Sequence, residues 1–308
     1  MRLQGITMST LHAVRFLLLA ASLCAGAWVE RDAAAQSAAC DRACLKTLVD
    51  GYFDALATRD PTKLPVAAEI RYTENGRVLD LGEGFWKTSG TPFRYRDYVL
   101  DPETGGAASF TAFKEYEGTA QMFLRLKVVN RQITEIETFV VRIGDQRWFA
   151  PQALETLSDI FAQPVSAAAR HTRAELTAAA DAYFTAVETE GTPQFVQAPF
   201  GPGLKRFENG LQTTNVKENP LLERHTWPPE LQLERAAYKG TLVRDRRYPL
   251  VDLEHGSVLA VATFRREGEH TPTLLLAEIF KVTEGKLREI RAVILNVPNG
   301  AGTGWTAP

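Results

Sequence analysis

Apolar and polar positions follow two periods along this chain, and the two periods recur in the same order. Apolar side chains stand at helical spacing between residues 43 and 57, and residues 173–188 show the same spacing. Each helical segment is followed by three runs rich in β-branched and apolar residues, separated by short polar links. These six runs cover residues 107–115, 119–129, 133–142, 258–266, 273–282 and 286–295. The pattern predicts a helix followed by an antiparallel meander, twice.

Matching residues in the same order indicate an internal duplication. Tyr52-Phe53 in the first helical segment corresponds to Tyr183-Phe184 in the second. An Asn-Gly pair, which suits the positive φ angles of a tight hairpin, follows at 75–76 and again at 209–210. Further correspondences are Glu74 with Glu208, Arg96 with Arg247, Asp101 with Asp252, Lys127-Val128 with Lys281-Val282, and Glu135-Ile136 with Glu289-Ile290. The spacing differs between the copies only where loops are expected, as in a duplicated domain that has diverged.

The predicted architecture is α+β: two tandem copies of one domain, each with helices packed on a curved antiparallel sheet. In each copy the sheet is expected to curl into a cone against its helix. We expect the two copies to pack sheet to sheet as an internal pseudo-dimer. The predicted boundaries are a signal peptide at 1–35, copy one at 36–150, a linker at 151–172 and copy two at 173–308.

The N-terminal segment has the organisation of a secretory signal. Arg2 and Arg15 precede an apolar run, residues 16–29, that is too short to span a bilayer. Small residues at 33–35 suit a cleavage site. Cys24 would anchor a lipoprotein, but the residue before it is a bulky leucine rather than a small one. We expect a periplasmic or secreted protein with no membrane attachment after the signal is cleaved.

Removal of this signal leaves Cys40 and Cys44, four positions apart, as the remaining cysteines. In an oxidising compartment this pair predicts a local disulfide. A metal site would need a histidine or a second cysteine pair nearby, and a redox pair would have two intervening residues. Both remain weaker alternatives.

Composition and charge restrict the class of partner. Hydrophobic residues make up 45% and charged residues 23% of the chain, and the net charge of −2 provides no field that favours nucleic acid. The chain contains no G-x-G-x-x-G, Walker A, H-E-x-x-H or G-x-S-x-G motif. The sequence therefore implies no cofactor and no metal, and a small organic molecule is the expected ligand.

With these residues in view, the chain resembles the nuclear-transport-factor-2-like (NTF2-like) superfamily, which includes the SnoaL-like proteins, and within it a duplicated, uncharacterised group. The resemblance covers roughly residues 40–305 and rests on the stretches 72–76, 247–254, 278–286 and 297–305. It implies a mostly apolar pocket inside each cone. The superfamily contains isomerases, dehydratases, epoxide hydrolases, polyketide cyclases and non-catalytic binding domains, so the resemblance alone selects no reaction.

Glu278 is the leading candidate for chemistry in copy two. It interrupts the apolar run 274–280, where an isolated carboxylate is costly unless it is paired or functional. Burial in a pocket would raise its pKa and suit it to acid–base catalysis near neutral pH. Leu124 stands at the equivalent position of copy one. The structural alternative is an edge glutamate paired with Arg288 or Arg291.

Arg247 and Asp252 form a second candidate constellation, mirrored by Arg96 and Asp101 in copy one. An arginine near a carboxylate could keep it ionised and orient a water molecule or a substrate. Recurrence in both copies favours instead a structural ion pair between the strand and the following turn. His255, three residues after Asp252, could shuttle protons, or it could be an exposed turn residue.

Two tryptophans in turn-rich segments are candidates for substrate contact. Trp227 belongs to the long segment 211–245, which could cover a pocket mouth or pack on the other copy. Trp86 in copy one has the same two interpretations, and packing is the default for both.

The leading hypothesis is a cofactor-independent lyase, isomerase or hydratase that transfers a proton on a small organic molecule in the cone of copy two. Glu278 or Asp252 would be the base, Arg247 would orient the substrate, and the segment carrying Trp227 would exclude water. Copy one would be mainly a scaffold. The alternative is a ligand-binding or interaction module of the cell envelope with two comparable cones. A third interpretation is a structural protein whose cones are both filled by side chains.

Overall fold

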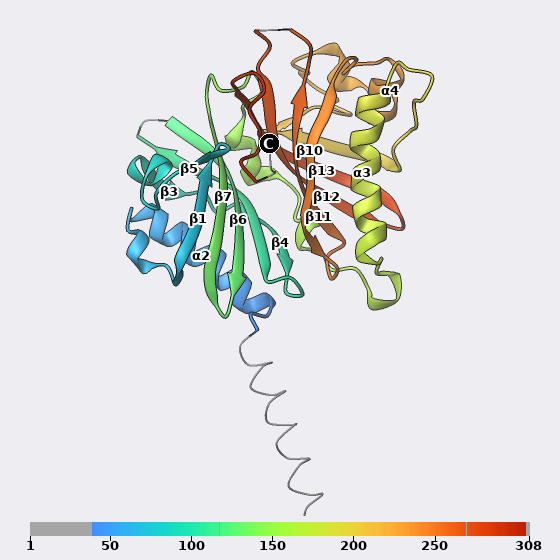
Figure 1. The fold of residues 1–308 in the computed structure, drawn as a ribbon. Helices are drawn as coiled ribbons and strands as arrows, with labels where there is room; N and C mark the ends of the chain where they lie inside the picture. The colour runs from blue at the N-terminus through green and yellow to red at the C-terminus, as the bar shows by residue number, and fades with distance from the viewer. Residues whose placement is uncertain (1–38, 117, 269, 306–308) are drawn as a thin grey trace, which may run out of the picture. The chain divides into compact units, whose positions relative to one another are not determined.

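A computed structural model describes residues 39–116, 118–268 and 270–305. It has two mixed β-sheets and few helices, an α+β architecture in which the same succession of elements occurs twice (Figure 1). The predicted signal peptide, with Cys24, lies outside the described residues. Within the three described ranges, no helix is both long enough and apolar enough to cross a membrane.

The two long helices lie where the apolar spacing predicts them. α2 spans Arg42–Ala57 and α3 spans Arg173–Thr189. Thr172 and Glu175 form a capping box that satisfies the first backbone N–H groups of α3. The other helices are short: α4 (Pro229–Glu234) and 3-10 helices at Pro61–Lys63, Gly84–Lys87, Pro151–Thr156, Ile160–Ala162, Ala167–Ala169 and Glu223–Thr226.

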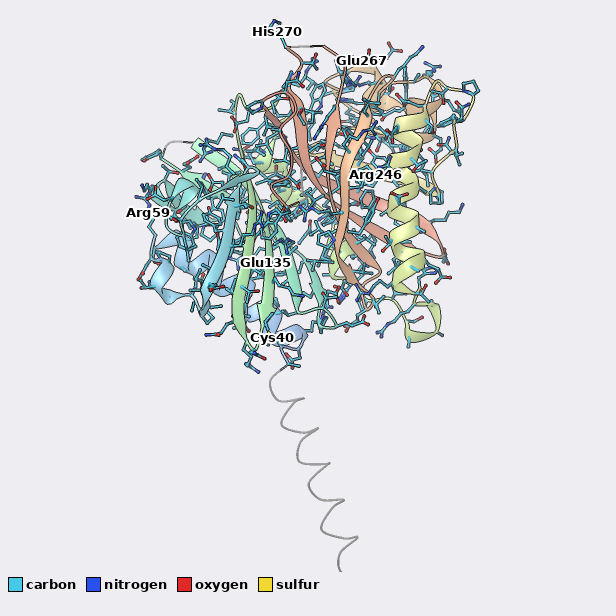
Figure 2. The ribbon with its side chains drawn as sticks, in the orientation of Figure 1. Cys40, Arg59, Glu135, Arg246, Glu267 and His270 are labelled. Carbon is cyan, nitrogen blue, oxygen red and sulfur yellow. A yellow bond between two sulfur atoms is a disulfide. The ribbon has the colours of Figure 1, made fainter. Side chains whose placement is uncertain are left out.

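The predicted disulfide between Cys40 and Cys44 is confirmed and lies at the start of α2, where Figure 2 labels Cys40. Asp41, between the two cysteines, caps the helix by accepting a hydrogen bond from the Cys44 backbone N–H at 2.8 Å. The bridge and the cap together fix the residue at which α2 begins.

The first sheet belongs to copy one and contains seven strands. Their order is β2-β1-β7-β6-β5-β3, and β4 also pairs with β5. Their bounds are β1 Val66–Glu74, β2 Arg77–Val78, β3 Ser89–Pro92, β4 Asp97–Asp101, β5 Gly106–Glu115, β6 Gly118–Val129 and β7 Gln132–Arg142. β5, β6 and β7 are the predicted meander.

The second sheet belongs to copy two and contains six strands in the order β10-β11-β12-β13-β8-β9. Their bounds are β8 Phe200–Glu208, β9 Leu211–Gln212, β10 Leu242–Asp252, β11 Ser257–Arg265, β12 Thr273–Thr283 and β13 Lys286–Val297. In this copy β11, β12 and β13 form the predicted meander.

The prediction of purely antiparallel sheets is wrong in one strand pair of each copy. β1 runs parallel to β7, and β8 runs parallel to β13. In both copies the chain leaves the first strand, forms the meander, and returns beside that first strand in the same direction. A parallel neighbour needs a long connection, and the intervening strands provide it.

The Asn-Gly turns of both copies adopt the backbone that their sequence predicts. φ is 52° and 77° at Asn75 and Gly76, and 47° and 84° at Asn209 and Gly210, so all four residues are in the left-handed region. These turns close the β1–β2 and β8–β9 hairpins, whose paired residues flank them directly.

Each Asn-Gly turn also lies against the C-terminal tail of the other copy. A Cβ on Gly76 would lie 2.6 Å from the Gly302 carbonyl oxygen, and a Cβ on Gly210 would lie 2.3 Å from the Ala150 carbonyl oxygen. Any side chain at either glycine would displace backbone. The close approach is a second reason, besides the positive φ, for glycine at both positions.

Hydrogen bonds hold each tail in place. Asn209 Nδ2 donates to the Trp148 carbonyl oxygen at 3.0 Å, and the Ala150 backbone N–H donates to the Asn209 carbonyl oxygen at 2.8 Å. In the opposite direction, Trp305 Nε1 of copy two donates to Thr73 Oγ1 of copy one at 2.8 Å. Residues 148–150 of copy one are thereby fixed at the β8–β9 turn.

Three apolar clusters form the core. One joins α2 to the first sheet and another joins α3 to the second sheet. The third combines residues of both sheets, among them Phe110, Phe123 and Phe139 of copy one with Leu259, Ile279 and Leu295 of copy two. The two copies therefore share one apolar cluster between their sheets. The central strands are covered on both faces, and their residues are accordingly buried in nearly continuous runs.

Reciprocal ion pairs connect the copies at the first residue of each long helix. Arg42 of α2 donates to both carboxylate oxygens of Asp252, at 2.9 and 2.7 Å. Arg173 of α3 donates to both carboxylate oxygens of Asp101, at 2.7 and 2.9 Å. Both carboxylates are 1% exposed. Because the two arginines and the two aspartates occupy equivalent repeat positions, the same bidentate contact is made twice.

Replacing Asp252 by Asn is expected to destabilise the protein at pH 7. Burial works to raise the pKa of Asp252, but the hydrogen bonds from His255 and Arg42 lower it to about 2. Because this folded-state pKa lies below the ordinary 3.8, the carboxylate stabilises the fold above that pH, and the contribution is lost as the pH falls towards about 2. We expect Asp252→Asn to lower the free energy of unfolding by ~2 kcal/mol at pH 7, measured by urea unfolding.

Asp54→Asn is the matched control for this prediction, since Asp54 is exposed on α2 and the change in charge is the same. It should leave the unfolding free energy near that of the wild type. An Asp252→Asn protein as stable as the control at pH 7 would contradict the prediction.

Candidate functional site

Copy two contains a cavity of about 740 Å³, bordered by α3, the second sheet and the tail of copy one. Its volume is typical of small-molecule sites. The apolar part of its wall comprises Ile143, Trp148, Phe264, Pro272, Leu274 and Ile294. The polar part includes Arg147, Tyr183, Glu208, Arg224, Tyr238 and Glu278. Glu267 and His270, labelled in Figure 2, mark the connection from β11 to β12, whose residues complete the rim.

Glu278 lies on β12 and lines this cavity. Its side chain is 1% exposed, and its neighbours across the sheet are Ala260 on β11 and Ala292 on β13. The Oε2 atom is buried and meets no hydrogen-bond partner among the described residues. The alternative pairing with Arg288 or Arg291 does not form, since both arginines bind other carboxylates.

The protonation of Glu278 follows from this environment. Burial raises its pKa to about 8; the nearby Glu208 acts in the same direction, and Arg206 opposes it. At neutral pH the group therefore carries a proton that it can donate, and above about pH 8 it carries a charge that can accept one.

Arg206 on β8 organises the polar wall beside Glu278. Its guanidinium group is buried, with Nε 3.0 Å from Glu208 Oε1 and Nη2 donating to Gln232 Oε1 at 2.8 Å. Nη1 donates to the Tyr183 hydroxyl at 3.4 Å. Acceptors on several sides compensate the loss of hydration of this charge. The same contacts fix the carboxylate and the phenol at the cavity wall.

Two tyrosine hydroxyls at the wall remain protonated. Burial raises the pKa of Tyr183 well above its ordinary value and raises that of Tyr238 to about 12. Arg206 also donates to the Tyr238 hydroxyl. Both phenols keep their protons at neutral pH. The Tyr238 hydroxyl donates to Gln232 Oε1 at 3.0 Å, so the Tyr183 hydroxyl is the one that can donate a hydrogen bond to an oxygen in the cavity.

The equivalent space in copy one is filled by side chains. Leu124 and Tyr72 occupy the positions of Glu278 and Arg206, and both are buried in the core. Trp86 is 1% exposed and packs edge-on against the tyrosine of α2, with ring centroids 5.3 Å apart. Of the two interpretations of Trp86, substrate contact or packing, the structure places this side chain in the core. The two copies are not equivalent, unlike the comparable cones that the binding-module alternative predicts.

Glu74, the copy-one counterpart of Glu208, has a structural role. One carboxylate oxygen accepts hydrogen bonds from the Tyr72 hydroxyl and from the Phe85 backbone N–H, both at 2.9 Å. Glu74 borders a separate cavity of about 530 Å³ near the β1–β2 hairpin. Neither Leu124 nor the helix α2 contributes to the described lining of that cavity.

The predicted local pairing of Arg247 with Asp252 does not form, because each binds a partner on the other copy. Arg247 Nη2 donates to Glu137 on β7 at 2.5 Å, whereas Asp252 is held by Arg42. His255 is 8% exposed rather than an exposed turn residue, and its Nδ1 lies 3.3 Å from Asp252 Oδ1. These residues lie at the junction of the two copies and do not line the 740 Å³ cavity.

Their copy-one counterparts are also in ion pairs. Arg96 donates to Asp50 on α2 at 2.6 Å, and Asp101 is bound by Arg173. Arg96 and His255 border a third, smaller cavity of about 450 Å³ at the junction. The structure thus brings none of the predicted Arg–Asp residues to Glu278.

Trp227 lies outside the described lining of the 740 Å³ cavity and packs under Arg235, with 4.3 Å between the guanidinium carbon and the ring centroid. Its long segment nevertheless supplies Arg224 and Tyr238 to that lining. The segment therefore borders the cavity through an arginine and a tyrosine rather than through Trp227.

Sequence reasoning missed several residues of the wall. Arg206 had a detectable signal, since it replaces the aromatic Tyr72 of the other copy at a strand position. Arg147 and Trp148 had none, because they reach the cavity only through the crossing of the copy-one tail onto β8.

No cluster of three or more histidine, cysteine, aspartate or glutamate side chains with the arrangement of metal ligands occurs among the described residues. A family model described as a domain of unknown function, DUF8021, matches residues 38–140 and 169–294. The chain belongs to the DUF8021 family. The two DUF8021 matches coincide with the two copies and confirm the duplication. No curated protein matches the chain.

Replacing Glu278 by Gln is expected to stabilise this DUF8021 protein increasingly as the pH rises from about 4.5 to about 8. The folded-state pKa exceeds the ordinary 4.5, so the folded protein retains a proton that the unfolded chain has released, and wild-type stability falls across this window. Each unit of pKa difference corresponds to about 1.4 kcal/mol, so the gap should reach several kcal/mol. Urea unfolding at a series of pH values measures it.

Glu218→Gln serves as the control, because Glu218 is exposed in the same copy. Its stability should follow the wild-type curve at every pH. Parallel curves for the wild type and Glu278→Gln would show that Glu278 does not titrate abnormally, and would refute the prediction.

Proposed function

We propose that this DUF8021 protein is a cofactor-independent enzyme that transfers a proton on a small organic molecule in the cavity of copy two. The observation that supports the proposal is Glu278, a buried carboxyl group with an unpartnered oxygen, in the wall of a cavity large enough for a substrate. Strongly shifted carboxyl groups in cavities are concentrated at functional sites.

In the proposed mechanism Glu278 is the general acid or base. Ionised, it removes a proton from a carbon atom next to a carbonyl group of the substrate. The hydroxyl of Tyr183, which accepts a hydrogen bond from Arg206, donates one to the oxygen on which negative charge develops. We no longer assign the base to Asp252, because Arg42 binds both of its carboxylate oxygens.

The fate of the proton distinguishes the reaction classes. An isomerase returns it from Glu278 to another carbon atom of the same substrate. A lyase delivers it to a leaving oxygen, and a hydratase runs that step in reverse. All three need one residue that both accepts and donates a proton, which a carboxyl group with a pKa of about 8 can do near neutral pH.

We further propose an NTF2-like origin for each copy, an internal pseudo-dimer of the two, and export of the mature chain. The long helix packed on a mixed sheet supports the first proposal. The reciprocal Arg–Asp pairs support the second. The Cys40–Cys44 disulfide fits an oxidising compartment and supports the third.

Base-catalysed opening of 5-nitrobenzisoxazole tests the proposed chemistry without knowledge of the natural substrate. The base removes the ring C–H proton, the N–O bond breaks, and the product is a coloured cyanophenolate. We expect a wild-type rate that rises with pH through a midpoint of about 8, as Glu278 ionises. Glu278→Gln should lower the rate by about 100-fold or more, since a positioned base contributes at least that factor.

Glu278→Leu gives copy two the residue of copy one and should be equally inactive, whereas Glu218→Gln should retain the wild-type rate. A wild-type rate equal to that of the buffer, or an undiminished rate in Glu278→Gln, would defeat the enzyme proposal and favour the non-catalytic binding module.

A further inference from the structure

Three arginines from separate segments line the cavity of copy two. Arg147 comes from the tail of copy one, Arg224 from the segment before α4, and Arg266 from the connection directly after β11. The guanidinium carbons of Arg147 and Arg224 lie 4.4 and 5.8 Å from the ring centroid of Trp148. Because both approach the same indole ring, these two cations share one region of the wall.

These arginines have no carboxylate partners. Within the described ranges, none of the three lies at ion-pair distance from an aspartate or a glutamate. Arg224 Nε is buried there without a hydrogen-bond partner. By contrast, Arg42 and Arg173 at the junction of the copies each bind a carboxylate with two hydrogen bonds. A buried guanidinium donor without an acceptor, on a residue that lines a cavity, is suited to an anionic group of a ligand.

The nearby acids compensate this positive charge only in part at neutral pH. Glu208 is paired with Arg206 at 3.0 Å. Glu278 is mostly protonated, since burial raises its pKa to about 8. Glu190 lies outside the described lining and interacts electrostatically with Arg266, Arg206 and Arg224. Burial raises its pKa to about 7, so it is only partly ionised at neutral pH.

The pKa of His225 is affected by the same positive charges. Its ring packs edge-on against Trp148 with centroids 5.3 Å apart. Burial lowers the pKa of His225 to about 4, and the positive charges of Arg224, Arg206 and Arg147 act in the same direction. The histidine is therefore neutral at pH 7, and the surrounding charge is carried by the arginines.

The same cavity also has an apolar side. Ile143, Phe264, Leu274 and Ile294 give it an apolar wall suited to a ring or a branched carbon skeleton. An inorganic anion would leave this apolar surface unused. A neutral apolar molecule would leave the arginine donors unsatisfied.

We infer that the cavity of copy two binds small organic acids, with the apolar body against this wall and the carboxylate on Arg224 and Arg147. The inference names the substrate class of the proposed enzyme and rests on that proposal for the identity of the site. With its carboxylate on Arg224 and Arg147, the ligand would present the rest of its skeleton to Glu278 and the Tyr183 hydroxyl.

Titration calorimetry at pH 7 with 3-phenylpropanoate, its neutral amide and inorganic phosphate tests the inference. We expect the acid to bind, and the amide and phosphate each to bind at least about tenfold more weakly, as expected for a lost charge-assisted hydrogen bond. Arg224→Gln and Arg147→Gln should each weaken the acid by about tenfold and leave the amide unchanged.

Arg235→Gln is the matched control, because Arg235 is exposed on the same segment as Arg224 and does not line the cavity. It should bind the acid as the wild type does. If Arg224→Gln fails to fold, the exposed Arg147 provides the same test. Equal binding of acid and amide, phosphate binding as tight as the acid, or unchanged acid affinity in the cavity variants would overturn the inference.

Glu278→Gln separates this inference from the proposed function. It should retain the affinity for 3-phenylpropanoate and lose the opening of 5-nitrobenzisoxazole. Acid binding without any wild-type turnover would remove the enzyme proposal and leave the binding site intact. Turnover that depends on Glu278, together with no preference for the acid, would remove the binding inference alone.

Discussion

The loss of hydration at one carboxyl group is the constraint that distinguishes copy two from copy one. A carboxyl group inside an apolar sheet is costly unless it is paired or neutral, and Glu278 has no paired cation. Arg206 is the cation that acts on the pKa of Glu278, but it already contacts Glu208, Gln232 and two phenols. The group therefore retains a proton, and its environment sets the chemistry available to the cavity.

Duplication explains how a costly group is tolerated. Copy one keeps an apolar, aromatic-filled interior, with Leu124 where copy two has Glu278. The shared core between the sheets and the two reciprocal Arg–Asp pairs hold both copies together. Copy one also contributes directly, since its crossing tail supplies Arg147 and Trp148 to the cavity. It is more than the scaffold that the sequence predicts.

Local patterns predicted the elements well, and long-range contacts explain what they missed. The helices, the meanders and the Asn75-Gly76 turn follow from periodicity and from backbone conformations that a few neighbouring residues determine. The parallel pairing of β1 with β7 depends on a return of the chain that no short window contains. The sequence predicted that Asp252 pairs with the nearby Arg247, but its partner is Arg42, 210 positions away. A pairing over this distance leaves no local signal. Glu278 could be identified because a charge in an apolar strand is a local anomaly, whereas its neighbour Arg206 required comparison of the two copies.

The most direct test is an NMR titration of the Glu278 carboxyl carbon, in protein labelled with ¹³C at the glutamate carboxyl groups. The resonance is assigned by its absence from the Glu278→Gln spectrum. The account predicts a midpoint of about 8. A midpoint near the ordinary value of 4.5 would mean that the carboxylate is hydrated or paired in solution, and would contradict the central claim.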